Sequence, residues 1–283
     1  MWIKKKEIEQ LSEFVKGYSS GEELDIRVNK EGSFNILKND IYALVNTKNE
    51  QIKAVEAERD SLSDYMADIS HQMKTPLTSI SLLLNLLQEE HLSEKKRLQY
   101  VQDLMKLTGR IDWMVYALLR LAKLDAGTVQ LQQIPYQIED LIKAAVTPLE
   151  IALDIRDITL EVQIQPDLQH RGDISWMTEA VSNILKNCME HTPSGGHIHI
   201  VTKDNPLYLL IKITDSGSGF TKQDLPHIFE RFYRGQNADT DSVGIGLALA
   251  KRIIIAQNGT IRAYNHKKDG GAVFEIRMYK GAV

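Results

Sequence analysis

Two long stretches of this chain carry apolar residues at alternating steps of three and four. The first runs from Ile41 to about Gln88, and the second follows Ser93 and ends at Asp125. This spacing places the apolar side chains on one face of an α-helix. Pro76 removes one backbone hydrogen bond from the first helix, but the pattern resumes at Leu77, so we expect a bend rather than an end. The two stretches therefore predict a hairpin of long helices.

A helical hairpin of this kind cannot cover its own apolar stripes. Two hairpins that pair with each other bury these stripes inside a four-helix bundle. We therefore expect a homodimer, with Ser93 as the N-cap of the second helix.

The hydrophobic period changes after Gly127. Residues 128–134, 158–164, 197–202, 208–214, 259–265 and 272–279 alternate as strands do, whereas residues 138–153 and 174–189 follow a helical pattern. The order of these segments lacks regular βαβ repetition. We therefore predict an α+β fold, in which a mixed, mostly antiparallel sheet is covered by helices on one face.

Composition excludes several classes of function. A length of 283 residues suggests about two domains. The net charge of −4 offers no basic excess for direct binding of nucleic acid. The single cysteine, Cys188, forms no internal disulfide and no cysteine-based zinc site.

The N-terminal part of the chain leaves alternatives open. Residues 1–6 place a tryptophan next to three lysines, which is typical of a segment just inside a membrane but also of an ordinary solvated start. No apolar run approaches the ~18 residues of a membrane helix. Residues 31–34 fit either a short relay element or a surface loop.

Two asparagines mark the first of four polar clusters after Gly127. Asn183 and Asn187 are four residues apart, so both amides lie on one face of the predicted helix. Amide oxygens suit Mg²⁺ when phosphates and water complete its coordination. The pair therefore indicates a possible Mg·ATP site, although two such residues also occur on solvated helix surfaces.

The second cluster follows a predicted strand. Asp215 stands at the strand end and is followed by Gly217 and Gly219. A carboxylate in this place can accept a hydrogen bond from an exocyclic amine such as that of adenine, and glycines allow a ligand to approach the backbone.

A pair of arginines forms the third polar cluster, and a pair of glycines forms the fourth. Arg231 and Arg234 stand among aromatic residues, ahead of a polar stretch, 236–242, that we expect to form a mobile lid. Gly244 and Gly246 then open a helix whose free N–H groups suit a phosphate. The chain has neither a Walker P-loop sequence nor a complete Gly-x-Gly-x-x-Gly, so another nucleotide fold is required.

In this order, the clusters resemble the N, G1, F and G2 boxes of the ATP-binding domain of sensor histidine kinases. Residues 69–77, Ile-Ser-His-Gln-Met-Lys-Thr-Pro-Leu, likewise resemble the H box of that family. The resemblance implies three parts. These are a membrane-proximal, HAMP-like connector and signalling helix (1–59), a dimerisation and histidine phosphotransfer domain (60–126), and a catalytic ATP-binding domain (127–283).

The resemblance also implies roles for residues of the H box. His71 would accept the phosphoryl group. Gln72 departs from the acid that the family often has there, so it would orient the imidazole without a charge. Thr75 would position a water for dephosphorylation of the partner, or is simply helix surface before Pro76.

The ATP-binding boxes carry implied ligands as well. The resemblance assigns Asn183 and Asn187 to Mg²⁺, Asp215, Gly217 and Gly219 to adenine, Arg231 and Arg234 to the phosphates, Gly244 and Gly246 to the lid hinge, and His191 to the nucleotide. Glu190 is a departure, because the family commonly has a basic residue there. Lys186, one turn earlier, either supplies that charge or pairs with Glu190.

Together these features predict an ATP-dependent protein histidine kinase. It would phosphorylate His71, pass the group to an aspartate of a response regulator, and also act as a phosphatase of that regulator. It would form the cytoplasmic portion of a cell-membrane protein whose transmembrane sensor lies outside this sequence. The alternatives are an ATPase that works as a conformational clamp and a dimeric scaffold that only senses nucleotide.

Overall fold

A computed structural model describes residues 8, 9, 12, 33–89, 91–235, 243–266 and 270–280. The chain divides into two compact units, Met1–Ile69 and Ser70–Val283. The predicted lid, 236–242, and nearly all of residues 1–32 lie outside the described residues. Within the described part, no helix is both long and apolar enough to cross a membrane.

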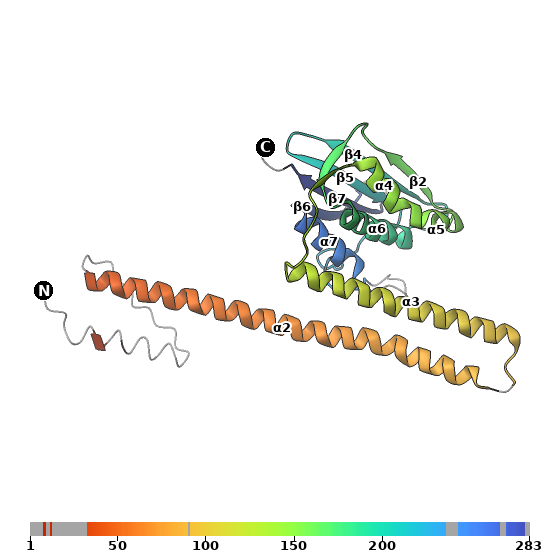
Figure 1. Cartoon of the computed structure of the whole chain (residues 1–283), viewed down its shortest axis with the longest axis horizontal. Helices are drawn as coiled ribbons and strands as arrows, with labels where there is room; N and C mark the ends of the chain where they lie inside the picture. The colour runs from red at the N-terminus through yellow and green to blue at the C-terminus, as the bar shows by residue number, and fades with distance from the viewer. Residues whose placement is uncertain are drawn as a thin grey trace. The chain divides into compact units, whose positions relative to one another are not determined.

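The first long helix, α2, spans Ser33–Leu87 and passes through Pro76 without ending (Figure 1). It begins eight residues before the predicted start at Ile41. Ser33 and Phe34 are helical, so this part of the 31–34 segment is no surface loop. Phe34 and Leu37 already continue the spacing of three and four that leads to Ile41, so the prediction placed the start of this helix too late.

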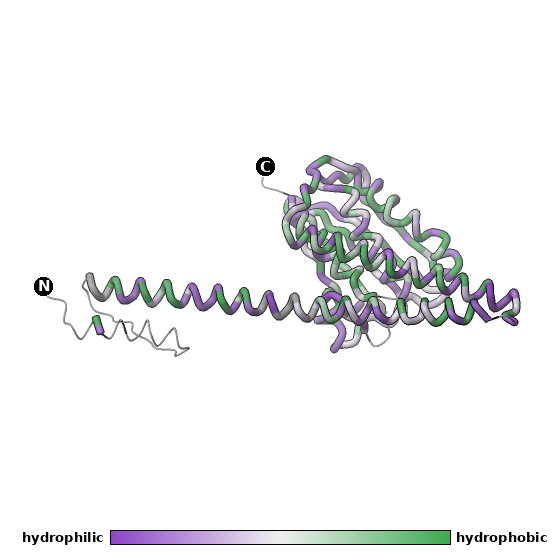
Figure 2. Tube along the Cα trace, turned by 60° about the horizontal axis from the view of Figure 1, so that its bottom comes forward, coloured by the Kyte–Doolittle hydropathy of each residue, from purple (hydrophilic) through white to green (hydrophobic). Residues whose placement is uncertain are grey.

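The second long helix, α3, spans Glu94–Asp125, and Ser93 is its N-cap residue, as predicted, although its side chain makes no capping hydrogen bond. Figure 2 shows apolar residues recurring along α2 and α3. Seam residues such as Leu98 and Val101 are exposed. A second apolar face of α3, which the sequence reading missed, is buried: it consists of Met114, Ala117, Leu121 and Leu124.

The remaining elements form the domain that follows Gly127. They are β1 (Ile134–Gln137), α4 (Ile138–Val146), the 3₁₀ turn η1 (Thr147–Leu149), α5 (Glu150–Ile155), β2 (Thr159–Gln163), β3 (Gln169–Gly172), α6 (Ile174–His191), β4 (His197–Asp204), β5 (Tyr208–Asp215), α7 (Gly246–Ala256), β6 (Gly259–Asn265) and β7 (Ala272–Tyr279).

The five-stranded sheet has the order β2-β4-β5-β7-β6. Only β2 and β4 are parallel, and the other neighbours are antiparallel. Alternate residues of β5 are buried, including Leu209, Ile211 and Ile213, and α6 and α7 contact the sheet to form a helical layer (Figure 1). The predicted α+β fold with a mixed, mostly antiparallel sheet is confirmed.

Two sequence predictions for this domain were wrong in detail. Residues 128–133 are not a strand, because pairing begins only at Ile134, opposite Gly172 of β3. The predicted helix 138–153 is interrupted at Thr147–Leu149, where Pro148 cannot donate a backbone hydrogen bond. Strand β3 was not predicted, since its residues, Gln-His-Arg-Gly, carry no apolar signal.

Candidate functional site

A cavity of about 440 Å³ lies between α3, α6, the end of β5, the segment 218–235 and the start of α7. Most of the predicted ligand residues line it. They are Asn183, Lys186, Asn187, His191, Asp215, Gly219, Arg234, Gly244 and Gly246. The fold therefore gathers four segments that are distant in sequence into one site.

The two asparagines are positioned by α6. Asn183 donates through Nδ2 to the backbone oxygen of Glu179 at 2.9 Å. Its Oδ1 consequently points the other way, and a Cβ built on Gly246 would lie 3.0 Å from it. The asparagine face of α6 thus meets the N-terminus of α7, where free backbone N–H groups favour an anion.

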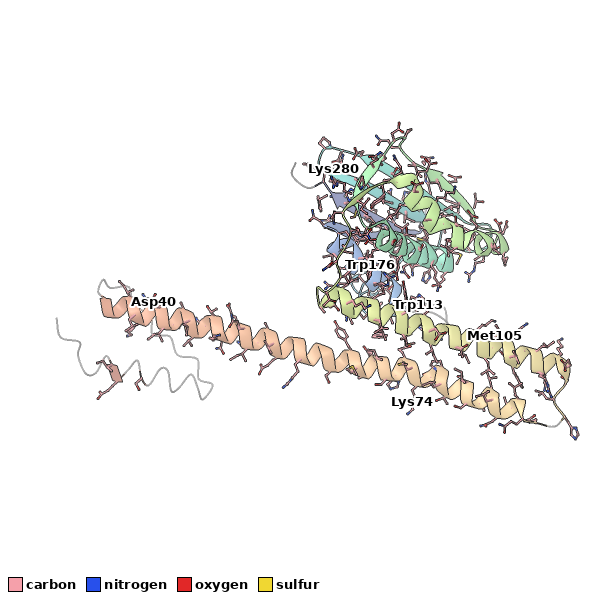
Figure 3. All side chains as sticks on the ribbon, in the orientation of Figure 1. Asp40, Lys74, Met105, Trp113, Trp176 and Lys280 are labelled. Carbon is pink, nitrogen blue, oxygen red and sulfur yellow. The ribbon has the colours of Figure 1, made fainter. Side chains whose placement is uncertain are left out.

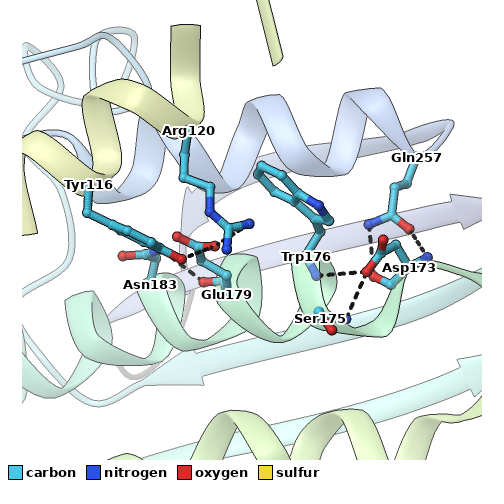
Figure 4. A network of polar contacts seen from close by, with 8 residues as sticks. All are labelled: Tyr116, Arg120, Asp173, Ser175, Trp176, Glu179, Asn183 and Gln257. Carbon is cyan, nitrogen blue, oxygen red and sulfur yellow. Dashed lines mark hydrogen bonds and ion pairs between the residues drawn. The ribbon is translucent and has the colours of Figure 1, made fainter. Parts of the chain in front are cut away.

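Helix α6 is fixed at its own N-terminus by a polar network (Figure 4). The Asp173 side chain accepts hydrogen bonds from the backbone N–H groups of Ser175 and Trp176. The N–H of Asp173 donates to Oε1 of buried Gln257 at 2.7 Å. Since Gln257 follows the last residue of α7, the network ties together α6 and α7, which both border the cavity.

Asp215 is a buried carboxylate in the cavity wall, with 3% of its surface exposed. Its Oδ1 accepts the N–H groups of Gly217 at 2.9 Å and of Ala272 at 3.0 Å, which fix its orientation. The Cys188 thiol also contacts it. Burial and then the charge of Asp215 raise the pKa of this thiol, so the thiol stays protonated and donates to the carboxylate.

Two glycines are needed for close approach between segments. A Cβ at Gly217 would collide with the backbone oxygen of His191, so only glycine allows this close approach. Gly217 is not one of the described residues that line the cavity. Gly244 has φ +75°, and a Cβ there would lie 2.5 Å from the backbone oxygen of Tyr233. Gly244 thereby joins the start of α7 to the segment that carries both arginines.

The two arginines of that segment have different surroundings. Arg234 lines the cavity, as predicted. Arg231 instead forms an ion pair with Asp125 at the end of α3, and Asp125 also pairs with Arg252 at 2.6 Å. In this arrangement the guanidinium of Arg231 faces α3, not the cavity.

Lys186 and Glu190 are both in the cavity wall and form an ion pair at 3.9 Å. The Nζ of Lys186 also lies 5.4 Å from the ring centroid of Trp113 on α3. The ion pair therefore supports the interpretation that Lys186 pairs with Glu190. That Lys186 also binds phosphate is a proposal.

The sequence reading missed a polar cluster beside the cavity. Buried Asp224 accepts hydrogen bonds from the hydroxyls of Thr221 and Tyr233, both at 2.7 Å. The three residues line the cavity and brace the segment ahead of residues 236–242. The spacing Thr221-x-x-Asp224, with a threonine that caps the backbone N–H of Asp224, was the available signal.

The predicted phosphoacceptor residues lie on α2. His71 is exposed, as expected, and Pro76 is buried. The hydroxyl of Thr75 donates to the backbone oxygen of His71 at 3.3 Å. Because Pro76 lacks an N–H, the carbonyl of Gln72 has no helical donor. Among the described residues that line the cavity, none comes from α2.

Comparisons with known proteins match both halves of this arrangement. Residues 172–281 match the family described as histidine kinase-, DNA gyrase B- and HSP90-like ATPase, and residues 61–127 match the His kinase A (phospho-acceptor) domain. The chain belongs to the sensor histidine kinases. The ATPase match implies that the domain containing residues 172–281 binds ATP.

Curated relatives support the family. Sensor protein SphS of Synechococcus elongatus is 31% identical over 81% of this kinase chain and 59% of its own length. Heme sensor protein HssS of Staphylococcus saprophyticus is 29% identical over 78% and 47% respectively. This histidine kinase chain therefore spans about half the length of the curated relatives it matches.

Solved structures support the fold of this kinase. The Acinetobacter baumannii histidine kinase AdeS aligns with a TM-score of 0.61 at 19% identity, covering 75% of this chain and 98% of that one. The histidine kinase ThkA in complex with the response regulator protein TrrA aligns with a TM-score of 0.65 at 18% identity, covering 82% and 66%.

The residues of this kinase fit Mg²⁺ only in company with a nucleotide. The described residues contain no group of three or more His, Cys, Asp or Glu placed to hold a metal ion. The donors at the cavity are the amide oxygens of Asn183 and Asn187, which are hard ligands. A donor set of two amides suits an ion whose remaining ligands are phosphate oxygens and water.

Proposed function

We propose that this chain is an ATP-dependent protein histidine kinase that phosphorylates His71 and passes the phosphoryl group to an aspartate of a response regulator. The observation that carries the proposal is that Asn187, Asp215, Arg234 and Gly246 line one cavity. A matched phosphoacceptor domain that contains exposed His71 adds the nucleophile.

Each wall of the cavity has a proposed task in binding Mg·ATP. Asp215 accepts the adenine amine, and Gly217 and Gly219 shape the turn around it. Asn183 and Asn187 hold Mg²⁺, which supplies charge neutralisation at the phosphates when bound. The N-terminus of α7 and Arg234 bind phosphate oxygens, and His191 lies against the nucleotide.

His71 acts as the nucleophile. The Nε2 lone pair attacks the γ-phosphorus in line, an N–P bond forms, and the bond from phosphorus to the bridging oxygen of ADP breaks. Gln72 accepts the Nδ1 proton in a hydrogen bond and so holds the attacking tautomer, but without the charge that a carboxylate would provide. Exposure of His71 on the helix allows both ATP and the regulator to reach it.

The proposed phosphatase activity uses Thr75. We propose that its hydroxyl positions a water for hydrolysis of the phosphorylated regulator, one helical turn from His71. In the structure this hydroxyl donates to the backbone oxygen of His71, so it would have to rotate toward the water. This makes the chain a phosphatase of its regulator as well as a kinase.

The chain is proposed to act as a homodimer through its hairpin. Seam positions of the hairpin expose large apolar side chains, among them Leu84, Leu98 and Val101. A second hairpin would cover them in a four-helix bundle. The match to the phosphoacceptor domain is consistent with such dimerisation.

We further propose that residues 1–59 connect this kinase region to the sensing part of a membrane protein, on the cytoplasmic side. The aromatic and lysine-rich start supports this location. So do the relatives named as sensor proteins, which extend beyond the part that this chain matches.

Incubation of the chain with γ-labelled ATP and Mg²⁺ tests the proposed function. Acid-labile, base-stable label on the protein is the expected result. Release of free phosphate without labelled protein would indicate an ATPase clamp instead, and bound nucleotide without either product would indicate a nucleotide-sensing scaffold.

A further inference from the structure

One wall of the ATP cavity is supplied by α3, which belongs to the phosphoacceptor region and not to the ATPase domain. The residues of α3 in this wall are Lys106, Leu107, Gly109, Arg110 and Trp113. They lie outside residues 172–281, which match the ATPase family. The cavity is therefore completed by a second domain.

Polar side chains hold α3 against α6 in this position (Figure 4). Glu179 of α6 accepts the hydroxyl of Tyr116 at 3.2 Å and forms an ion pair with Arg120 at 3.3 Å. The guanidinium of Arg120 also lies 4.0 Å from the ring centroid of Trp176. Figure 3 labels Trp113 and Trp176 where side chains of α3 and α6 meet.

The C-terminal half of α3 adds an apolar contact and a second ionic one. Met114 and Leu121 belong to the buried face of α3, and α3 contacts α7. Asp125 then pairs with Arg231 and Arg252 at the end of the helix. Contacts made by residues 114–125 of α3, just C-terminal to the cavity wall, thus fix α3 relative to the ATP-binding domain.

The charges of the described cavity residues show what α3 contributes. The ATP-binding domain supplies two cations, Lys186 and Arg234, and three acids, Glu190, Asp215 and Asp224. Lys186 is already paired with Glu190. The α3 wall adds two cations, Lys106 and Arg110, and no acid, which changes the net charge of these residues from −1 to +1.

We propose that Lys106 and Arg110 bind the triphosphate of ATP when the ATP-binding domain is docked on α3. The two residues are one helical turn apart and so share a face. With adenine at Asp215, the phosphates lie toward Asn187 and the start of α7, in the cavity that these two cations border. The inference rests on the proposed binding of ATP in this cavity.

This contact belongs to an arrangement that holds ATP and does not transfer its phosphate. None of the described residues of the cavity wall comes from α2, which carries His71. Bound triphosphate would strengthen the docking of the domain on α3, and transfer would require the domain to leave it.

Nucleotide affinity of the whole chain tests the proposal. A chain with Lys106→Gln and Arg110→Gln should bind a non-hydrolysable ATP analogue roughly tenfold more weakly at low salt, while its affinity for adenosine changes less than about twofold. Competition against a fluorescent nucleotide measures both. The matched control carries Lys95→Gln and Lys96→Gln, exposed lysines in the first turn of α3, and should bind like the wild type.

The outcomes are distinguishable. Equal affinity of the wild type and the double variant for the ATP analogue overturns this inference, and so does an equal loss for adenosine, which would indicate a structural defect. Lys106→Gln alone, at an exposed position, gives the same comparison if the double variant is unstable. Failure of the wild type to bind the analogue would instead refute the proposed function.

Discussion

The ATP-binding domain and the helical hairpin bury their apolar residues in different ways. In the domain, residues of the sheet and of its helical layer, such as Ile184, Ile211 and Ile276, are fully buried against each other. In α3, one apolar face is buried at Met114 and its neighbours, whereas seam residues such as Leu98 remain 57% exposed. The domain thus has a core of its own, and the hairpin requires a second surface.

The same contrast applies to chemistry. The ligand residues of the domain come from four segments that only the tertiary fold brings together. The phosphoacceptor residues are neighbours on a single helix. A change at His71 should therefore abolish phosphorylation with little effect on nucleotide binding, whereas a change at the ligand residues of the domain should weaken both.

The largest effect is expected from His71→Ala. Stable labelling by γ-labelled ATP should be lost completely, while ATP affinity stays within a few-fold, because His71 is not among the described cavity residues. His91→Ala, at an exposed histidine in the hairpin turn, is the control and should label normally. Persistent labelling of the His71 variant would contradict the assignment.

Leu118→Asp tests the incomplete core of the hairpin. A carboxylate in the bundle seam should convert a dimer into monomers or unfold the hairpin, because an unpaired charge is costly to bury. Light scattering gives the mass, and circular dichroism separates the two results. Lys95→Asp, an exposed position on the same helix, should remain dimeric. A wild-type monomer at micromolar concentration would refute the bundle.

Asp215→Asn tests what the ATP-binding domain itself contributes to nucleotide binding. A neutral acceptor in place of a buried charged one should weaken ATP binding by about 1–3 kcal/mol, or roughly 5- to 150-fold. Calorimetry with adenine and guanine nucleotides measures the loss and its selectivity. If both affinity and base preference were unchanged, adenine would bind elsewhere.

The smallest effect concerns the pH dependence of stability. Burial, and then the charge of Lys280, lower the pKa of His170, whereas Asp204 opposes the shift. The unfolded chain then binds the proton more readily, so His170 contributes its full stability above about pH 6.5 and loses it as pH falls. Denaturant unfolding between pH 7 and 5 should show a smaller decline for His170→Gln. An identical decline of the free energy of unfolding in both proteins would exclude His170 as a cause of the pH dependence.

The sequence predicted the hairpin, the sheet and most of the ATP cavity because these depend on local patterns and on motifs at matching spacing. The buried face of α3 was missed because the apolar seam of the same helix accounts for the obvious period. The Asp125 contact of Arg231 and the α3 wall were missed for a related reason. Both contacts depend on how α3 docks on the ATP-binding domain. No local pattern in the sequence around Lys106 or Asp125 specifies that docking.

The position of the phosphoryl group tests the central claim most directly. The whole chain is incubated with ATP and Mg²⁺, digested at mildly alkaline pH and fragmented by electron transfer in a mass spectrometer. Phosphate on His71 is the predicted result. Phosphate on Ser70, Thr75 or another histidine, with His71 unmodified, would contradict the account.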